Sequence, residues 1–342
     1  MLIAGAGMAG LVCAARAREL GLRPRVVEKG TRAGGSMFLS SCVIWRHLEW
    51  EDFRRECPDG DETLQRLIWE RLDDSLAWLS SLGAEPVWDD TENPLTTGKR
   101  FDPQALTALL ARDVELETPL PADADGHVVL ATGGFGKRLA AERGLLLRAN
   151  PWSEGDGLDY AVARGAETTS GMDEFYGRAM PAPPARIHEE DFVRLSQLYG
   201  KWAWVHTPNG RVITPPSVSW SENDLAQLIG PSAWFVLNDE GYEVARDRVE
   251  AARAAGGTVL DADEIPFETR PDASVAIHVS AAVTHTIGGL KVDRCMRTHA
   301  HAQVYACGVD VGGVATGGYA SGLAQALVTG LVAAETVADA NR

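Results

Sequence analysis

The sequence contains little cysteine, and its cysteines do not form the pattern of a disulfide framework. The five cysteines (Cys13, Cys42, Cys57, Cys295 and Cys307) are an odd number, lie far apart and include no C-x-x-C pair. A chain of 342 residues is long enough to bury a core without covalent cross-links. We therefore expect reduced thiols and a cytoplasmic location.

Positive charge is also scarce. The chain has 32 Lys and Arg residues against 48 Asp and Glu residues, which gives a net charge of −16. Nucleic acids and anionic membranes bind basic surfaces, so neither is an expected partner. The 45% of apolar residues and 23% of charged residues are typical of a globular protein, and the length predicts two or three domains.

Motifs for metal-dependent and nucleophilic catalysis are missing. The sequence has no H-E-x-x-H, no G-x-S-x-G, no P-loop and no cluster of Cys with His. His299 and His301 alternate in a segment that resembles an exposed turn, so we expect no metal ion.

One uncharged run is long enough to cross a membrane, and it lies between Asp310 and Glu335. It contains six glycines together with Tyr, Ser and Gln, which is more typical of a glycine-rich turn followed by a packed helix. No basic leader precedes the first motif. We expect neither membrane insertion nor a signal peptide.

The first thirty residues predict a strand, a glycine turn, a helix and a second strand. Gly5-Ala6-Gly7-Met8-Ala9-Gly10 fits G-x-G-x-x-G, in which glycines permit a tight turn and a close approach to a pyrophosphate. Glu28 stands 18 residues after Gly10, where a carboxylate accepts hydrogen bonds from a ribose hydroxyl and repels a 2′-phosphate. The pair predicts an adenine dinucleotide site and disfavours NADP.

Two further glycine segments favour FAD over NAD. Ala33-Gly34-Gly35-Ser36 follows the second strand, and Thr132-Gly133-Gly134 follows an apolar strand over 127–131. After about residue 171 the composition changes and the pattern becomes less regular, with six prolines between 181 and 216 and four tryptophans between 202 and 234. This region reads as an inserted domain. Short apolar strands return near Ser280, and a small-residue helix follows from about Ser321 to Ala338.

The chain resembles the fumarate reductase and succinate dehydrogenase flavoprotein superfamily, and within it the branch of 3-ketosteroid dehydrogenases. The matching segments are V-V-E-K-G-T-R-A-G-G-S-M (26–37), V-V-L-A-T-G-G-F-G (128–136), E-G-D-G-L-D-Y-A-V-A-R-G-A (154–166), T-H-T-I-G-G-L-K-V-D (284–293) and Y-A-C-G-V-D-V-G-G (305–313). They occur in family order and touch about half of the chain. The resemblance is therefore far more specific than one glycine motif.

The resemblance implies an α/β fold: a Rossmann-like FAD-binding domain with a central parallel sheet and an inserted, shortened α+β cap. The FAD-binding domain would comprise residues 1–170 and 280–342, and the cap residues 171–279. The family's flavin-attaching histidine is replaced by the segment 38–41, so the FAD is expected to be noncovalent. The implied FAD-binding residues are Gly5, Gly7, Met8, Ala9, Gly10, Glu28, Lys29, Gly34, Gly35, Ser36, Ala131, Thr132, Gly133, Asp156, Gly308, Asp310, Ser321, Gly322 and Leu323.

The prediction about the substrate rests on residues that differ from the family pattern. Fumarate-reducing relatives hold a dicarboxylate with histidines and arginines, and of these only His285 has a match here. Tyr319 stands where the last arginine would stand, and without paired cations burying a dicarboxylate is costly. Tyr319 followed by Gly322 resembles the ketosteroid dehydrogenase site, although the spacing differs. There a Tyr hydroxyl and a backbone N–H hold the substrate ketone.

We therefore expect an FAD-dependent oxidoreductase acting on a C–C bond next to a carbonyl, with a hydride exchanged at flavin N5. Tyr319, His285 and Gly322 would bind the substrate. For proton transfer the candidates are Tyr199, Tyr176 and Tyr242, with Tyr199 slightly preferred. The electron donor or acceptor is unknown.

Two alternatives remain open. One is a reductase of an unsaturated carboxylic acid, in which Arg178 or Arg211 replaces the missing arginines. The other is a non-catalytic binding protein that keeps the flavin fold. Packing roles for Tyr319 and His285 also remain open.

Overall fold

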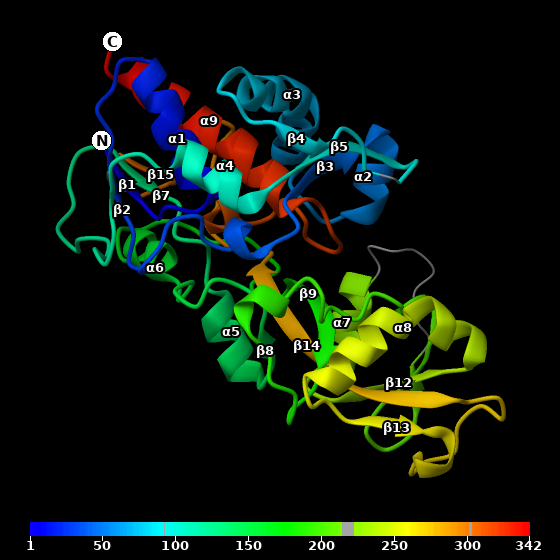
Figure 1. Ribbon diagram of the computed structural model, residues 1–342. Helices are drawn as coiled ribbons and strands as arrows, with labels where there is room; N and C mark the ends of the chain where they lie inside the picture. The colour runs from blue at the N-terminus through cyan, green and yellow to red at the C-terminus, as the bar shows by residue number, and fades with distance from the viewer. Residues whose placement is uncertain (92, 214–221, 301–302) are drawn as a thin grey trace. The chain divides into compact units, whose positions relative to one another are not determined.

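The computed structural model describes residues 1–91, 93–213, 222–300 and 303–342 (Figure 1). Contacts divide the chain into two compact units. Unit 1 comprises Met1–Arg138, Ala149–Glu174 and His285–Arg342, and unit 2 comprises Leu139–Arg148 and Phe175–Thr284. The cap predicted for residues 171–279 overlaps most of unit 2. The sequence-based division differs in three places, because residues 171–174 belong to unit 1 and residues 139–148 and 280–284 to unit 2. Residues 139–148 join unit 2 because strand β8 (Leu146–Leu147) pairs with strand β14 (Val275–Thr286).

Unit 1 is built on a five-stranded sheet in the order β15-β7-β1-β2-β6, and every pair of neighbours is parallel. The strands are β1 (Leu2–Ala4), β2 (Arg25–Val27), β6 (Val114–Glu115), β7 (Val128–Leu130) and β15 (Val304–Ala306). β1, β7 and β15 are buried along their whole length, as strands of a covered parallel sheet are. The predicted α/β fold with a central parallel sheet is confirmed.

Helices α1 (Met8–Glu19) and α9 (Gly322–Ala340) pack against each other in unit 1, although they come from opposite ends of the chain (Figure 1). Gly330 permits this contact, since a Cβ atom there would lie 2.6 Å from the backbone oxygen of Ala9. Among the described residues, α9 is the one helix long and apolar enough to cross a membrane. Within unit 1, 72% of its apolar window is buried, as in the core helix of a folded domain.

Unit 1 also contains further helices and a second, smaller sheet. These helices are α2 (Trp50–Glu56), α3 (Glu62–Ser81), α4 (Pro103–Leu110) and α6 (Asp156–Val162), and the small antiparallel sheet contains β3 (Val43–His47), β5 (Thr96–Phe101) and β4 (Pro86–Trp88). Short 3-10 turns lie at Met37–Leu39 (η1) and Gly308–Asp310 (η6). Helix α5 (Gly136–Arg143) carries the chain from unit 1 into unit 2.

Unit 2 is an α+β structure around a seven-stranded sheet. The order β11-β10-β12-β14-β13 forms its main path, and β8 and β9 also pair with β14. The elements not yet given are β9 (Phe175–Pro181), β10 (Trp204–His206), β11 (Val212–Ile213), β12 (Ala233–Leu237), β13 (Val259–Asp261), α7 (Glu222–Ile229), α8 (Asp239–Ala254) and the 3-10 turns η2 (Glu189–Asp191), η3 (Gly200–Trp202) and η5 (Ala262–Glu264). β14 ends two residues beyond unit 2, at Thr286.

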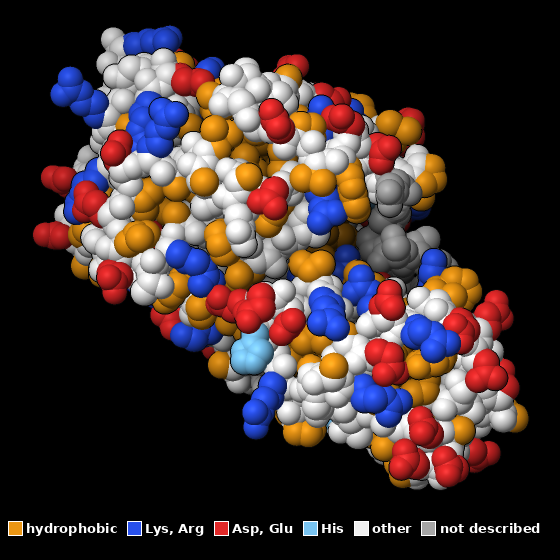
Figure 2. All heavy atoms as spheres, viewed as in Figure 1, with side chains coloured by type: hydrophobic (Ala, Val, Ile, Leu, Met, Phe, Trp, Pro, Cys, Tyr) orange, Lys and Arg blue, Asp and Glu red, His pale blue; other side chains and the backbone are white. Residues whose placement is uncertain are grey.

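The surface reflects the acidic composition. On the face drawn in Figure 2, the blue Lys and Arg side chains are interspersed with red Asp and Glu side chains. The described residues form no continuous basic area on that face.

Replacing Gly330 with Ala tests the contact between α1 and α9. In an ordinary helix this change stabilises by about 0.5–1 kcal/mol. Here the added methyl meets the Ala9 carbonyl, so we expect the opposite sign, a loss of about 1–3 kcal/mol in the free energy of unfolding. Denaturant unfolding measures it, and unchanged or higher stability would show that the helices do not meet at Gly330.

Candidate functional site

The turn between β1 and α1 packs so closely on the first residues of α1 that only glycine fits at Gly5 and Gly10. Gly5 has φ +103°, and a Cβ atom there would lie 2.1 Å from the Ala131 oxygen. A Cβ on Gly10 would lie 2.0 Å from the Gly5 oxygen. The first helical bond of α1 joins Leu11 N to the Gly7 oxygen, at 3.0 Å. The backbone N–H groups before it are therefore available to an anion at the helix N-terminus.

The second glycine segment packs directly on this turn. Gly34 N donates to the Ala6 oxygen at 2.7 Å, and a Cβ on Gly35 would lie 3.0 Å from Gly7 Cα. Ser36 is tied to the segment after β8, because its hydroxyl accepts a hydrogen bond from Asn150 N at 3.1 Å. Two segments that the sequence assigns to FAD thus meet at one place.

Glu28 lies at the end of β2 and is 5% exposed. Its two carboxylate oxygens accept hydrogen bonds from Ala6 N and Gly30 N, each at 2.8 Å. These bonds fix the carboxylate beside the first glycine turn. Each oxygen keeps a second lone pair, which suits the ribose hydroxyl predicted from the sequence.

Lys29 and Asp156, both expected at the FAD site, contact each other. Lys29 Nζ lies 2.6 Å from carboxylate oxygens of both Asp156 and Glu154. Hydrogen bonds from Lys137 and Lys29 lower the pKa of Glu154 to about 2. These ion pairs join the loop after β2 to the start of α6.

Asp310 holds the third glycine turn in place. Its carboxylate accepts hydrogen bonds from the backbone N–H and hydroxyl of Thr132, and from Gly134 N at 3.3 Å. The Thr132 hydroxyl also accepts from Gly157 N at 3.1 Å. Asp310 is 2% exposed, and burial raises its pKa to about 6 against the effect of these bonds. The structure therefore gives Asp310 a positioning role that its sequence motif does not reveal.

Gly308 lies between α1 and α9. Its φ is +64°, and a Cβ atom there would lie 2.8 Å from the Cβ atom of Ala9. Its backbone N–H donates to the hydroxyl of Thr329 at 2.8 Å. The described residues thus supply a glycine cradle, an anion-binding helix start and an oriented carboxylate, which fit an adenine dinucleotide.

The predicted substrate residues of unit 1 gather around the start of α9. Ser321 caps this helix, and its hydroxyl accepts hydrogen bonds from Ala324 N at 3.3 Å and from Trp45 N at 3.4 Å. The His285 imidazole lies against Gly322, since a Cβ there would be 2.7 Å from His285 Cε1. Burial lowers the pKa of His285 to about 4, so its ring is neutral at pH 7. Leu323 is the second residue of the helix.

Two aromatic residues of β3 complete this cluster, and sequence reasoning missed both. The rings of Trp45 and Tyr319 pack edge to face with centroids 5.5 Å apart, and Trp45 also contacts His47 at 5.2 Å. His47 is 1% exposed, and burial lowers its pKa to about 4 even though Asp52 and a backbone hydrogen bond with Tyr319 oppose this. The sequence does contain a pattern that could have identified them: in Trp45-Arg46-His47 the two rings are two residues apart, which places both on the same face of a strand.

The predicted residues of unit 2 lie in different surroundings. Tyr176 and Arg178 pair on β9, where Arg178 Nε donates to the Tyr176 hydroxyl at 3.0 Å. Tyr199 is 1% exposed, and its ring packs on Phe235 at 5.6 Å. Burial strongly raises the pKa of Tyr199, and no described residue hydrogen-bonds its hydroxyl. Its acid–base role stays a prediction.

The remaining candidates are outside these clusters. Tyr242 is on α8, where its hydroxyl donates to Glu250 at 2.9 Å, and Arg211 is exposed. His301 lies outside the described residues. Among the residues that are described, no group of three or more His, Cys, Asp or Glu side chains is arranged to hold a metal ion.

Residues 1–101 match the model of a family described as FAD binding domain. This segment contains the first two glycine turns and Glu28, so the predicted cofactor FAD is confirmed. Among curated proteins, no sequence matches this chain.

Many solved structures have the fold of the whole chain, including a fumarate reductase and two ketosteroid dehydrogenases. An open-conformation flavocytochrome c3 fumarate reductase superposes with TM-score 0.74 at 18% identity, over 99% of this chain and 78% of that one. A 3-ketosteroid-delta4-(5alpha)-dehydrogenase from Rhodococcus jostii superposes with TM-score 0.64 at 16% identity, over 98% of this chain and 96% of that one. A 3-ketosteroid delta1-dehydrogenase from Sterolibacterium denitrificans gives 0.69 at 14% identity, over 99% of both chains.

The protein thus has the flavoprotein fold that the sequence resemblance implied. Its first 101 residues match the FAD binding domain model, and its full length has the fold of the fumarate reductase and the ketosteroid dehydrogenases above.

Replacing Glu28 with Gln tests the FAD site. The amide offers one acceptor oxygen to two backbone donors and turns an N–H toward one of them, so the loop after β2 loses its anchor. We expect at least about a tenfold weaker FAD affinity, equivalent to about 1.4 kcal/mol. Flavin fluorescence titration of the apoprotein measures it. Glu117→Gln is the control, because Glu117 is exposed near the same loop; equal affinities in both variants would contradict the assignment.

The raised pKa of Asp310 predicts a pH-dependent stability. Because about 6 exceeds the value of about 3.9 in an unfolded chain, protonated Asp310 stabilises the fold by about 3 kcal/mol below pH 4. This contribution is lost as the pH rises through about 6. The advantage of the wild type over Asp310→Asn should shrink by about 2 kcal/mol between pH 4 and pH 7 in denaturant unfolding, because at pH 4 about half of the unfolded chains already have an ionised Asp310. A constant difference would rule out a raised pKa.

Proposed function

We propose that the protein is an FAD-dependent oxidoreductase that dehydrogenates or reduces a C–C bond adjacent to a carbonyl in a cyclic ketone or enone. The observation that carries this proposal is the uncharged character of the cluster at the start of α9. Tyr319 and Trp45 carry no charge, and His285 and His47 are neutral at pH 7 because burial lowers the pKa of each to about 4. FAD, bound noncovalently, supplies the two-electron exchange.

Neutral donors suit a ketone better than a carboxylate. A phenol hydroxyl stabilises negative charge that develops on a carbonyl oxygen, and it does so without desolvating a permanent ion pair. The N-terminus of α9 adds backbone N–H groups and the positive end of its dipole. A buried dicarboxylate would instead require cations, which these four side chains do not supply.

Trp45 orients the tyrosine. Its backbone N–H is bonded to the capping residue Ser321, and its ring packs on the edge of Tyr319. The phenol ring is therefore held between a fixed strand and the turn that begins α9. This constraint supports a role in positioning a substrate oxygen.

The fold neighbours support the same substrate class. The two ketosteroid dehydrogenases were solved with 4-androstene-3,17-dione and 1,4-androstadiene-3,17-dione. Both are aligned over at least 96% of their own length, against 78% for the fumarate reductase.

Reduction of an unsaturated acid is the second candidate. It is favoured by Arg178, a cation in unit 2 whose guanidinium lies 5.1 Å from the Tyr176 ring centroid. Reduction of acrylate-type substrates that is lost in Arg178→Ala would support this candidate.

The cytoplasmic location stays a prediction. All five cysteines are free thiols in the structure, as the sequence led us to expect.

The reaction class is tested by visible absorption of the purified protein under anaerobic conditions. Cyclic ketones, enones and dicarboxylates are added in turn, with a reductant present for the acceptors. Bleaching by a saturated ketone, or reoxidation by an enone, supports the proposal and gives the direction of electron flow. A flavin spectrum that no compound changes would favour a non-catalytic binding protein.

Tyr319→Phe removes the hydroxyl and keeps the ring against Trp45. We expect turnover to fall by about 10²–10³, the effect of losing one oxyanion donor, with FAD content unchanged. Tyr305→Phe is the control, since the Tyr305 hydroxyl contacts His127, at 3.1 Å, and Tyr305 belongs to none of the candidate sites. Near-normal turnover of Tyr319→Phe would assign Tyr319 to packing.

A further inference from the structure

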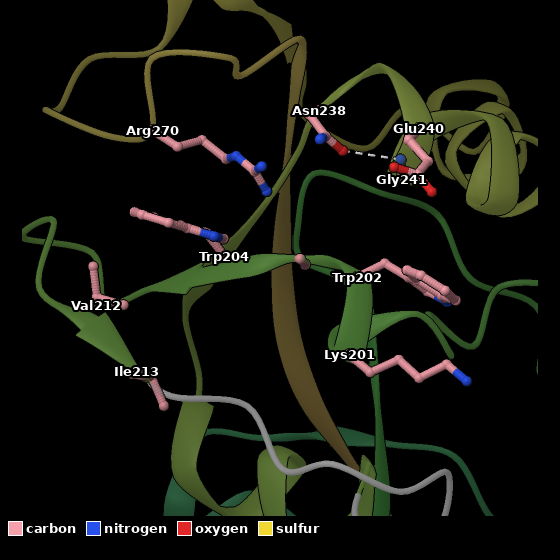
Figure 3. Close-up of a pocket in the computed structure, with 10 residues that line it drawn as sticks. Lys201, Trp202, Trp204, Val212, Ile213, Asn238, Glu240, Gly241 and Arg270 are labelled. Atoms are coloured by element: carbon pink, nitrogen blue, oxygen red, sulfur yellow. Dashed lines mark hydrogen bonds between the residues drawn. The ribbon is translucent and has the colours of Figure 1, made fainter.

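Unit 2 contains a pocket outside the residues assigned above. It encloses about 390 Å³ and is lined by Lys201, Trp202, Ala203, Trp204, Val212, Ile213, Asn238, Glu240, Gly241 and Arg270 (Figure 3). This volume is within the range of pockets that hold small molecules. All of the lining residues belong to unit 2, so the pocket is complete within one compact part of the chain.

Two indole rings border this pocket. Trp202 is 41% exposed and Trp204 is 44% exposed, a large fraction for side chains of this size. The Arg270 guanidinium lies 5.3 Å from the Trp204 ring centroid, and Lys201 Nζ lies 5.2 Å from that of Trp202. Figure 3 shows the two indoles directed to opposite sides of the short segment that joins them.

The polar wall is held in place without a ligand. Asp272 accepts hydrogen bonds from Arg270 Nε at 2.5 Å and Nη2 at 2.7 Å, and from Asn238 Nδ2 at 3.2 Å. Asn238 also caps α8 by accepting from Gly241 N at 3.0 Å, the dashed line in Figure 3. A wall fixed in this way binds a ligand with a smaller loss of conformational entropy.

Several polar groups of the lining stay unused within the described ranges. No described residue forms a hydrogen bond or ion pair with Lys201 Nζ, with the Glu240 carboxylate or with either indole N–H. The pocket therefore offers free donors and a free acceptor together, beside two aromatic rings and the apolar side chains of Val212 and Ile213.

These features select a class of ligand. The charges around the pocket nearly cancel, because Lys201 and Arg270 are offset by Glu240 and by Asp272, which is bonded to Arg270, so no net charge selects an anion. A wholly apolar molecule would desolvate Lys201 and Glu240 without replacing their hydrogen bonds with water. A sugar ring presents C–H groups on its faces and hydroxyls around its rim. The C–H groups match the negative face of an indole, and each hydroxyl both donates and accepts.

We propose that this pocket is a binding site for a neutral saccharide, with sugar rings stacked on Trp204 and Trp202 and hydroxyls bonded to Lys201, Glu240 and Arg270. The site adds a binding activity to the flavin chemistry and does not depend on it.

The test is isothermal titration of the FAD-loaded protein with maltotriose, cellotriose and tri-N-acetylchitotriose. We expect saturable, millimolar binding of at least one of these probes, and at least about a tenfold loss of affinity in Trp204→Ala. Trp88→Ala is the matched control, because Trp88 is 42% exposed and also has a cation near its ring, Arg100 at 4.3 Å. FAD content and thermal unfolding establish that both variants fold.

Three results would overturn the proposal. They are the absence of saturable binding for all three probes, equal affinity of Trp204→Ala and the wild type, and equal losses in Trp204→Ala and Trp88→Ala. Because the readout is heat of saccharide binding and not turnover, failure of the proposed oxidoreductase activity would leave this result unaffected.

Discussion

The structure of unit 1 depends on close backbone contact around residues 5–10. Gly10 lies over Gly5, Gly35 lies on Gly7, and Gly308 and Gly330 pack on Ala9. In each pair a side chain on the glycine would overlap the partner. The first turn therefore joins segments from residue 35, residue 308 and residue 330, and the FAD binding domain forms only when distant parts of the chain assemble on it.

Burial of ionisable groups determines the chemistry that this assembly permits. Glu28 and Asp310 are both nearly inaccessible, and each is surrounded by hydrogen-bond donors. At the start of α9, burial instead keeps His285 and His47 neutral. One end of unit 1 is therefore suited to the hydroxyls and phosphates of a dinucleotide, and the cluster near α9 to an uncharged carbonyl.

Unit 2 combines a mainly antiparallel sheet with polar groups of two kinds. Some, such as Tyr199, are enclosed in the core, and others, such as Trp202 and Trp204, are at the surface beside cations. The described tryptophans of this region also differ among themselves, since Trp202 and Trp204 are exposed and Trp234 is half-buried and stacked on His278. Composition alone does not separate them, because burial depends on which strand each residue occupies and on its neighbours in the sheet.

The sequence by itself determined the parallel sheet, the glycine turns and the FAD site, because these depend on local spacing and on glycines that nothing else can replace. It also singled out Tyr319 and His285 as candidate substrate residues. Only the tertiary structure decided that Trp45 and His47 join them, since β3 meets α9 across more than 270 residues of chain. It likewise decided that Asp310 holds the Thr132 turn, because burial and long-range hydrogen bonds have no local sequence pattern.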